Sequence, residues 1–219
     1  MLQVLIIMIK DKITPQLKKR FLQEIKKTRD TGKEYGFHLC IERNTQLSAG
    51  NTCVGNECSI KFQSPDLSCP GRKVQGEFHT HPYLEDVRKQ FNITFKMLHK
   101  GSDELLDASV RSFLEEKGPI HTLPSHSDTI DAILGKCAKK MEGTICIGSD
   151  LDQTRVECWT TKSIDEGDCV RALVERLSPS EEEKGKEGEE EKSTLPHEWV
   201  KPLFEVEIID LKNTKRRTL

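Results

Sequence analysis

The sequence predicts an α/β (α+β) domain built on a mixed sheet that is flanked by helices. Short apolar runs typical of strands alternate along the chain with segments whose apolar residues recur at helical spacing. The length of 219 residues suits one sizeable domain with an appendage. Because strands and helices alternate, we expect the strands to share one sheet and the helices to cover its faces.

The first part of the chain predicts a strand, a helix and three further strands. The apolar run Leu2–Ile9 is typical of a strand. Thr14 followed by Pro15 is the pattern of a helix N-cap with proline at the first helical position, and Gly32 is suited to end that helix. The next strands are predicted over residues 34–42 and 73–81, with a turn and another strand between them over residues 51–62.

The second part predicts an insertion, a helix, a hairpin and a returning strand. Two amphipathic helices interrupt the strand pattern over residues 83–122, and a third helix follows with an apolar face from Ile130 to Met141. A strand pair over 144–161 and a short helix over 165–177 come next. The predicted organisation is a domain over 1–177, an acidic linker or loop over 178–194, and a C-terminal strand with a basic tail over 195–219.

Composition and charge disfavour two classes of partner. The formal net charge is −2, whereas a general nucleic-acid binder normally shows a basic excess. No apolar run approaches the roughly eighteen residues that a membrane span requires. The run Leu2–Ile9 lacks the basic start and the small-residue cleavage site of a signal peptide. We therefore expect a cytoplasmic protein that binds neither nucleic acid nor membrane.

Three of the eight cysteines, Cys53, Cys58 and Cys69, lie close together in the sequence. No second Cys-x-x-Cys and no nearby Cys/His pair completes a zinc knuckle. Buried thiols are the first interpretation, because cysteine is among the most buried residue types. A disulfide stays open as an alternative, as in the intracellular proteins of hyperthermophiles.

The tetrapeptide HTHP over residues 79–82 predicts a metal site. In a strand, residues i and i+2 point to the same face, so His79 and His81 can reach one ion. The proline after them stops strand pairing and places His81 at the rim of the sheet. Two surface histidines in a strand are the alternative interpretation.

The pentapeptide PSHSD over residues 124–128 opens the third predicted helix. Ser125 and Asp128 form the Ser-x-x-Asp pattern of a capping box, and a carboxylate is stabilised in the first turn of a helix. That turn can also face the end of a neighbouring strand. Capping and metal ligation by Asp128 are therefore compatible.

Together these motifs resemble the JAMM (MPN-type) zinc metalloproteases, which carry an upstream Glu, then H-[ST]-H-P, then S-x-x-D. The resemblance covers about residues 14–161 and implies a cytidine-deaminase-like MPN/JAB architecture. It implies that His79, His81 and Asp128 bind zinc, that Glu34 is the general acid/base, and that Ser125 stabilises the oxyanion. It further implies hydrolysis of peptide or isopeptide bonds, with conjugates of ubiquitin or a ubiquitin-like modifier as partners.

Two features depart from the family pattern. The insertion over residues 83–122 lengthens the path between the two motifs, and we expect it beside the site as a substrate-recognition element or lid, or as a decorative subdomain. The residues around Glu34 match the family only loosely, so Glu42 and Glu77 are rivals for the acid/base role.

Other classes of function receive less support. A catalytically silent MPN-type scaffold that binds protein partners is the alternative, although such members usually lack a His or the Asp that this chain retains. A zinc base deaminase would need H-x-E and P-C-x-x-C, and neither occurs. His126 is a candidate to support the site from outside the ligand set, whereas His38, His99, His121 and His197 are predicted as surface or locally bonded residues.

Overall fold

The computed structural model describes residues 8–43, 45–56, 59–92, 103–117, 122–177 and 196–212. Its strands are β1 (Tyr35–Ile41), β2 (Leu47–Ala49), β3 (Cys53–Val54), β4 (Lys73–His81), β5 (Thr144–Ser149), β6 (Arg155–Thr161) and β7 (Phe204–Asp210). Its helices are α1 (Ile9–Lys12), α2 (Pro15–Thr31), α3 (Pro65–Ser68), α4 (Leu84–Gln90), α6 (Asp103–Lys117), α7 (His126–Cys137) and α8 (Glu166–Leu177), with a 3₁₀ turn over Lys201–Leu203.

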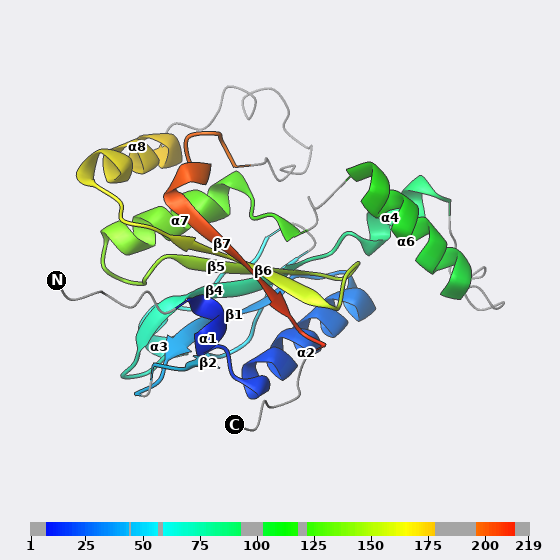
Figure 1. Cartoon of the computed structure of the whole chain (residues 1–219), viewed down its shortest axis with the longest axis horizontal. Helices are drawn as coiled ribbons and strands as arrows, with labels where there is room; N and C mark the ends of the chain where they lie inside the picture. The colour runs from blue at the N-terminus through cyan, green and yellow to red at the C-terminus, as the bar shows by residue number, and fades with distance from the viewer. Residues whose placement is uncertain are drawn as a thin grey trace.

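Within the described residues, the seven strands form one mixed sheet (Figure 1). The strand order is β2-β1-β4-β5-β6-β7, and β3 pairs with β1. Only β4 and β5 run parallel; the other pairs are antiparallel. A parallel pair needs a crossover, and here the crossover contains α4, α6 and α7. The parallel pair also fixes the register that matters for the site, with His79 opposite Ile147 and His81 opposite Ser149.

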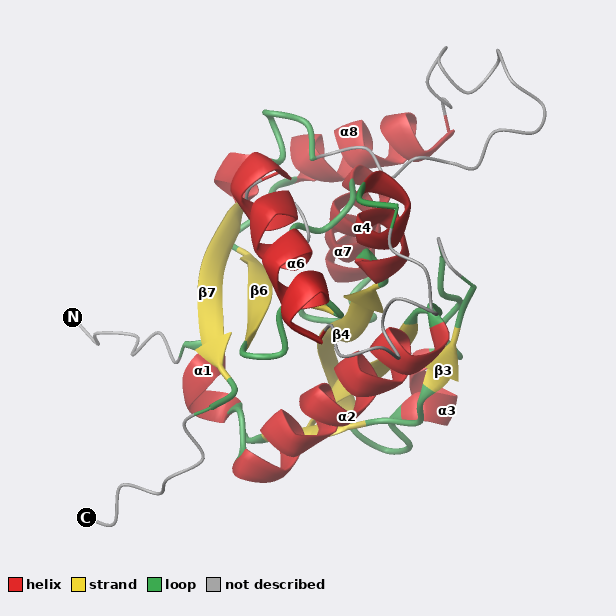
Figure 2. Ribbon diagram, turned by 90° about the vertical axis from the view of Figure 1, so that its right-hand side faces the viewer, coloured by secondary structure: helices red, strands yellow, loops and turns green. Residues whose placement is uncertain are grey.

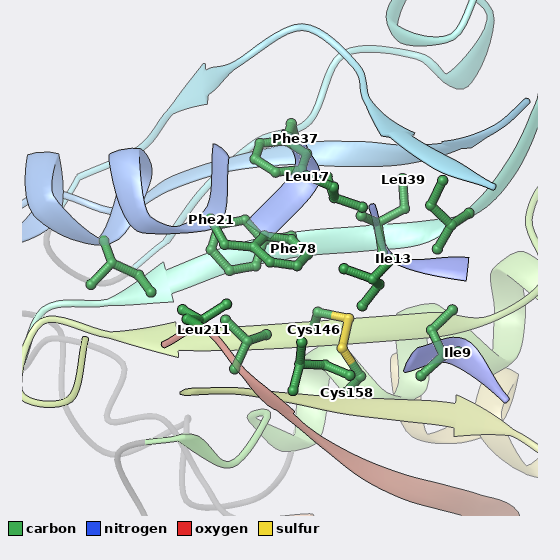
Figure 3. Close-up of a cluster of buried hydrophobic side chains, with 14 residues drawn as sticks. Ile9, Ile13, Leu17, Phe21, Phe37, Leu39, Phe78, Cys146, Cys158 and Leu211 are labelled. Carbon is green, nitrogen blue, oxygen red and sulfur yellow. A yellow bond between two sulfur atoms is a disulfide. The ribbon is translucent and has the colours of Figure 1, made fainter. Parts of the chain in front are cut away.

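Helices cover both faces of the sheet, with α2 on one side and α7 and α8 on the other (Figures 1 and 2). Along β4, Phe78 faces α2 and packs against Phe21 and Phe37, with ring centroids 4.5 and 5.0 Å away (Figure 3). The residues on either side of Phe78 point to the opposite face because strand side chains alternate. On that face Ile145 and Ile147 pack with the apolar side of α7.

The insertion forms a small subdomain that projects from one end of the sheet (Figure 1). Helices α4 and α6 pack through their own apolar cluster, which also includes one residue that follows β5; its buried members are Leu84, Val87, Leu106, Phe113 and Leu151. The two predicted insertion helices are therefore confirmed, although α4 ends at Gln90 and residues 93–102 lie outside the described part of the chain.

The mixed sheet flanked by helices and the caps of α2 are confirmed. Thr14 accepts a hydrogen bond from the Leu17 amide, and Gly32 ends the helix with a φ of 68°. The turn and strand predicted over 51–62 are only partly right: among the described residues of this segment, Cys53 and Val54 alone are in β conformation. The Asn56 side chain accepts a hydrogen bond from the Ser59 amide, a local contact that competes with strand pairing.

Strands were predicted near both ends of the chain. Ile9 begins the short helix α1, so the predicted N-terminal strand does not extend to this residue, and residues 1–7 are not described. The returning strand is confirmed as β7, which pairs with β6 at the edge of the sheet. The acidic segment and the basic tail lie outside the described residues. No described helix has the length and the apolar character that a membrane crossing requires.

Three disulfides join pairs of elements: Cys40–Cys69, Cys137–Cys169 and Cys146–Cys158. The interpretation of the three nearby cysteines as buried thiols holds for Cys53, which is buried and free. Cys69 instead forms a disulfide with Cys40 on β1, and residue 58 is not described. Disulfides persist in oxidising compartments and in intracellular proteins of hyperthermophiles. A cytoplasmic location therefore stays a prediction.

Candidate metal centre

The two histidines of the HTHP motif lie side by side at the end of β4. Both are buried and point to the α7 side of the sheet, because their neighbours Phe78 and Thr80 point to the α2 side. Their Nε2 atoms are 3.2 Å apart. Two imidazole nitrogens thus converge on one point from consecutive positions of one strand face.

The capping box at the start of α7 brings a carboxylate to the same point. The Ser125 hydroxyl accepts a hydrogen bond from the Asp128 amide at 3.1 Å, and Asp128 Oδ2 accepts one from the Ser125 amide at 2.7 Å. The same Oδ2 lies 3.4 Å from His79 Nε2. Capping therefore orients Asp128 toward the histidines.

The donor spacing fits a tetrahedral zinc ion. Zinc bonds of about 2.0–2.1 Å at tetrahedral angles separate neighbouring ligand atoms by about 3.3 Å. The observed separations are 3.2 Å between the histidine nitrogens and 3.4 Å between His79 and Asp128. All three donor atoms lie within 4.8 Å of one another. His79, His81 and Asp128 therefore form a set that could hold a metal ion.

The electrostatics of the cluster favour a cation. Burial by itself lowers the pKa of His79, but the nearby carboxylates, chiefly Asp128, outweigh it and raise the pKa to about 9. Burial would also raise the pKa of Asp128, yet His79 holds it below its usual value. The free site thus attracts positive charge, which a divalent ion would supply in place of protons.

Glu34 lies beside this cluster, immediately before β1. Its backbone is held by the loop after β3, because its amide donates to the Asn56 carbonyl at 2.8 Å and its carbonyl accepts from the Gly55 amide at 2.9 Å. Burial raises the pKa of Glu34 to about 7, while His79 lowers it and Asp128 adds to the rise. A carboxyl group with this pKa can both accept and donate a proton near neutral pH.

The two rival glutamates occupy different places. Glu42 follows the far end of β1, where it is paired with Arg72, so it lies away from the metal cluster. Glu77 shares the strand face with the histidines, and its Oε1 lies 4.0 Å from His79 Nδ1. That nitrogen is on the opposite side of the ring from the one facing Asp128. This position suits a carboxylate that orients the imidazole rather than one that reaches the reacting atoms.

Gly36 on β1 makes room for the histidine pair. It lies opposite His79 in the antiparallel register, and a Cβ at this position would come within 2.4 Å of the Phe78 carbonyl oxygen and 3.0 Å of His79 Cβ. Both neighbours belong to the backbone or its first side-chain atom, so neither can rotate away.

We expect Gly36→Ala to destabilise the chain by about 1–3 kcal/mol, the usual cost of an overpacked site. It should also weaken zinc binding, because β1 must shift against His79. Chemical denaturation and zinc titration measure the two effects. Gly167→Ala is a matched control, since its added methyl group meets only the Asp165 carboxylate near the exposed start of α8. If Gly36→Ala has the stability and the zinc affinity of the wild type, the close approach of Gly36 to His79 is not required.

The insertion is anchored at the rim of the site. Asp150, at the end of β5, accepts hydrogen bonds from the Tyr83 amide at 2.9 Å and the Leu84 amide at 3.1 Å. Burial raises the pKa of Asp150 to about 6, and these hydrogen bonds oppose the rise. The Tyr83 ring lies 5.8 Å from the His81 ring, centroid to centroid. The first residues of the insertion thus border the metal cluster.

Three further residues shape the site although the sequence did not suggest them: Thr80, Tyr83 and Asp150. The Thr80 hydroxyl hydrogen-bonds to Thr28 on α2, accepts from the Tyr35 amide and donates to the Tyr35 carbonyl, so it holds the residue next to Glu34. The orientation of Thr80 was predictable from the sequence, because a residue between two histidines that share one strand face must point to the opposite face of the sheet. Asp150 carried no such signal, since its partners lie far away in the sequence.

The chain was compared with known proteins. It matches no protein-family model, and no curated protein matches its sequence.

Proposed function

We propose that the protein is a zinc-dependent hydrolase of peptide or isopeptide bonds. The observation that carries this proposal is the convergence of His79, His81 and Asp128 at tetrahedral spacing, with a buried glutamate of raised pKa beside them. A set of two His and one carboxylate with an open fourth position is typical of catalytic rather than structural zinc sites. The motif resemblance and the mixed sheet with flanking helices support an MPN/JAB-type architecture.

In this proposal, different residues bind the metal, transfer the proton and stabilise the oxyanion. A zinc ion held by the three ligands would lower the pKa of a coordinated water to about 7 and polarise a carbonyl group. Glu34 accepts a proton from the attacking water and delivers it to the leaving amine. The Ser125 hydroxyl donates to the oxygen on which negative charge develops. The capping box holds Asp128 in place, and Glu77 lies 4.0 Å from the outer nitrogen of His79.

The motif resemblance suggests conjugates of ubiquitin or a ubiquitin-like modifier as substrates, and the position of the insertion beside the site agrees with such substrates. Helix α4 begins at the rim of the site. Together with α6 it projects from the domain (Figure 1). A folded modifier presents its scissile bond on an extended tail, so recognition needs protein surface beside the metal. The insertion supplies such a surface, and we propose that it contacts the conjugate.

The test is cleavage of a panel of ubiquitin and ubiquitin-like conjugates, with both linear and isopeptide bonds, by the zinc-loaded chain. We expect cleavage of at least one conjugate, loss of cleavage after chelation, and recovery with added zinc. His81→Ala should lose one equivalent of zinc and all measurable hydrolysis. Hydrolysis that survives complete metal removal would contradict the proposal. A chain that holds this zinc ion but cleaves no conjugate would instead favour a partner-binding scaffold.

A further inference from the structure

A second group of side chains that can bind a metal includes His126, which lies between Ser125 and Asp128. His126 is the first residue of α7, Glu175 lies on α8, and His197 lies just before the turn that leads into β7. Their donor atoms all lie within 4.8 Å of one another. We propose that these three residues bind a second zinc ion, distinct from the one assigned to His79, His81 and Asp128.

The donors converge on one carboxylate oxygen. Glu175 Oε2 lies 2.7 Å from His126 Nε2 and 3.4 Å from His197 Nδ1. The two imidazole rings stack with centroids 3.7 Å apart and an interplanar angle of 21°. Two imidazolium ions at this distance would repel each other, so the arrangement suits two neutral rings that share one cation. The 3.4 Å separation matches the spacing of about 3.3 Å that tetrahedral zinc requires, and the 2.7 Å separation would have to lengthen on binding.

Neighbouring residues orient the carboxylate of Glu175 for metal binding. The Trp199 indole N–H donates to the other oxygen of Glu175, Oε1, at 2.8 Å, and Arg171 lies 3.8 Å from that same oxygen. The Arg171 guanidinium also covers the Trp199 ring, 4.2 Å from its centroid. Oε2 is thereby left for the histidines. Outer partners of this kind fix the ligands of known metal sites.

The tautomer of His126 agrees with this assignment. The backbone amide of His197 donates to His126 Nδ1 at 3.3 Å, so Nδ1 is the acceptor and Nε2 carries the proton of the neutral ring. Zinc binding at Nε2 would displace that proton to the solvent, and the carboxylate would then bind zinc instead of the N–H group. His197 Nδ1, which also faces Glu175 Oε2, would likewise exchange this contact for a bond to the ion.

The donor set favours zinc over the hard cations. Two imidazoles and one carboxylate suit Zn²⁺, whereas Mg²⁺ and Ca²⁺ take oxygen ligands. Within the described part of the chain the group supplies three protein donors, and His197 is 56% exposed, so water can complete the coordination. The ion would join α7, α8 and the segment that leads into β7, where the Cys137–Cys169 disulfide already links the two helices.

Zinc stoichiometry in single and double variants of the full chain tests this proposal. The metal-free chain is titrated with Zn²⁺ alone, and bound metal is counted by elemental analysis after gel filtration. We expect two equivalents for the wild type, one for His197→Ala, one for His81→Ala and none for the double variant. Glu198→Gln is the matched control, because this neighbouring carboxylate is exposed and pairs with Lys201; it should keep two equivalents.

The outcomes separate the two sites. If His197→Ala holds as many equivalents as the wild type, the second site is overturned, whatever happens at His81. If the wild type holds one equivalent that His197→Ala loses and His81→Ala keeps, the second site stands and the proposed active site fails. Trp199→Phe keeps the ring but removes the N–H donor, so it should weaken the second site about 10–100-fold. Unchanged affinity in that variant would also contradict the ligand geometry.

Discussion

Glu34→Gln should lower the rate of hydrolysis by about 10²–10⁴-fold while zinc stays bound, because glutamine keeps the size of the side chain but cannot accept a proton. Glu34 is 6% exposed and lies next to the cluster without belonging to the ligand set, so the substitution leaves the three ligands in place. Steady-state rates on a cleaved conjugate and zinc content of the same preparation measure the two quantities.

Two other glutamates serve as controls for that experiment. Glu42→Gln should be fully active, since Glu42 pairs with Arg72 at the far end of β1. Glu77→Gln should weaken zinc binding by about 10–100-fold and regain its rate at high zinc, because Glu77 faces the outer nitrogen of His79. An active Glu34→Gln beside a zinc-loaded but inactive Glu77→Gln would move the acid/base role to Glu77.

Ser125→Asn should leave the melting temperature nearly unchanged and lower turnover by about 10²–10³-fold. Asparagine caps a helix as well as serine does, so the hydrogen bond from the Asp128 amide can be kept. It does not keep a hydroxyl group where charge develops on the substrate, and the loss of one such donor typically has this effect on rate. Thermal melting, zinc content and kcat should be measured on one preparation.

Ser127→Ala is the matched control for Ser125, because its hydroxyl lies 2.9 Å from the Ser125 hydroxyl and belongs to the same turn. Its rate should remain within a few-fold of the wild type. If Ser125→Asn melts and hydrolyses like the wild type, Ser125 acts as a helix cap only, and the oxyanion must be stabilised by the metal and other groups.

The local part of the fold was predictable from sequence because it depends on residues close together in the chain. The Thr14-Pro15 start and Gly32 end of α2 follow from capping rules, and so does the Ser125–Asp128 box. Strand β4 matches its prediction over residues 73–81. The turn and strand expected over 51–62 match only in the short strand β3. The Asn56 side chain accepts a local hydrogen bond from the Ser59 amide, and an apolar pattern alone does not reveal such competition with strand pairing.

The site was predictable only in part, for a physical reason. The histidines share one strand face and the aspartate follows from a helix cap, so short-range rules together with the motif resemblance suggested the ligand set. The choice between Glu34, Glu42 and Glu77 depended on strand register, which single-sequence reasoning does not supply. His197 was expected to be a local surface residue, and its approach to His126 and Glu175 is a tertiary contact without any sequence signal.

The parallel pairing of β4 with β5 has a consequence for how the proposed zinc site would form. Asp128 is carried by the long crossover between these strands, so it meets the histidines only after that non-local contact has formed. Contacts of this kind close slowly, because a large loop must be ordered first. The unfolded chain thus holds Asp128 far from the two histidines, and it would compete poorly for the proposed ion. By mass action, each tenfold rise of free zinc above the dissociation constant should then favour the folded state by about 1.4 kcal/mol, which ties the persistence of this fold to the zinc supply around it.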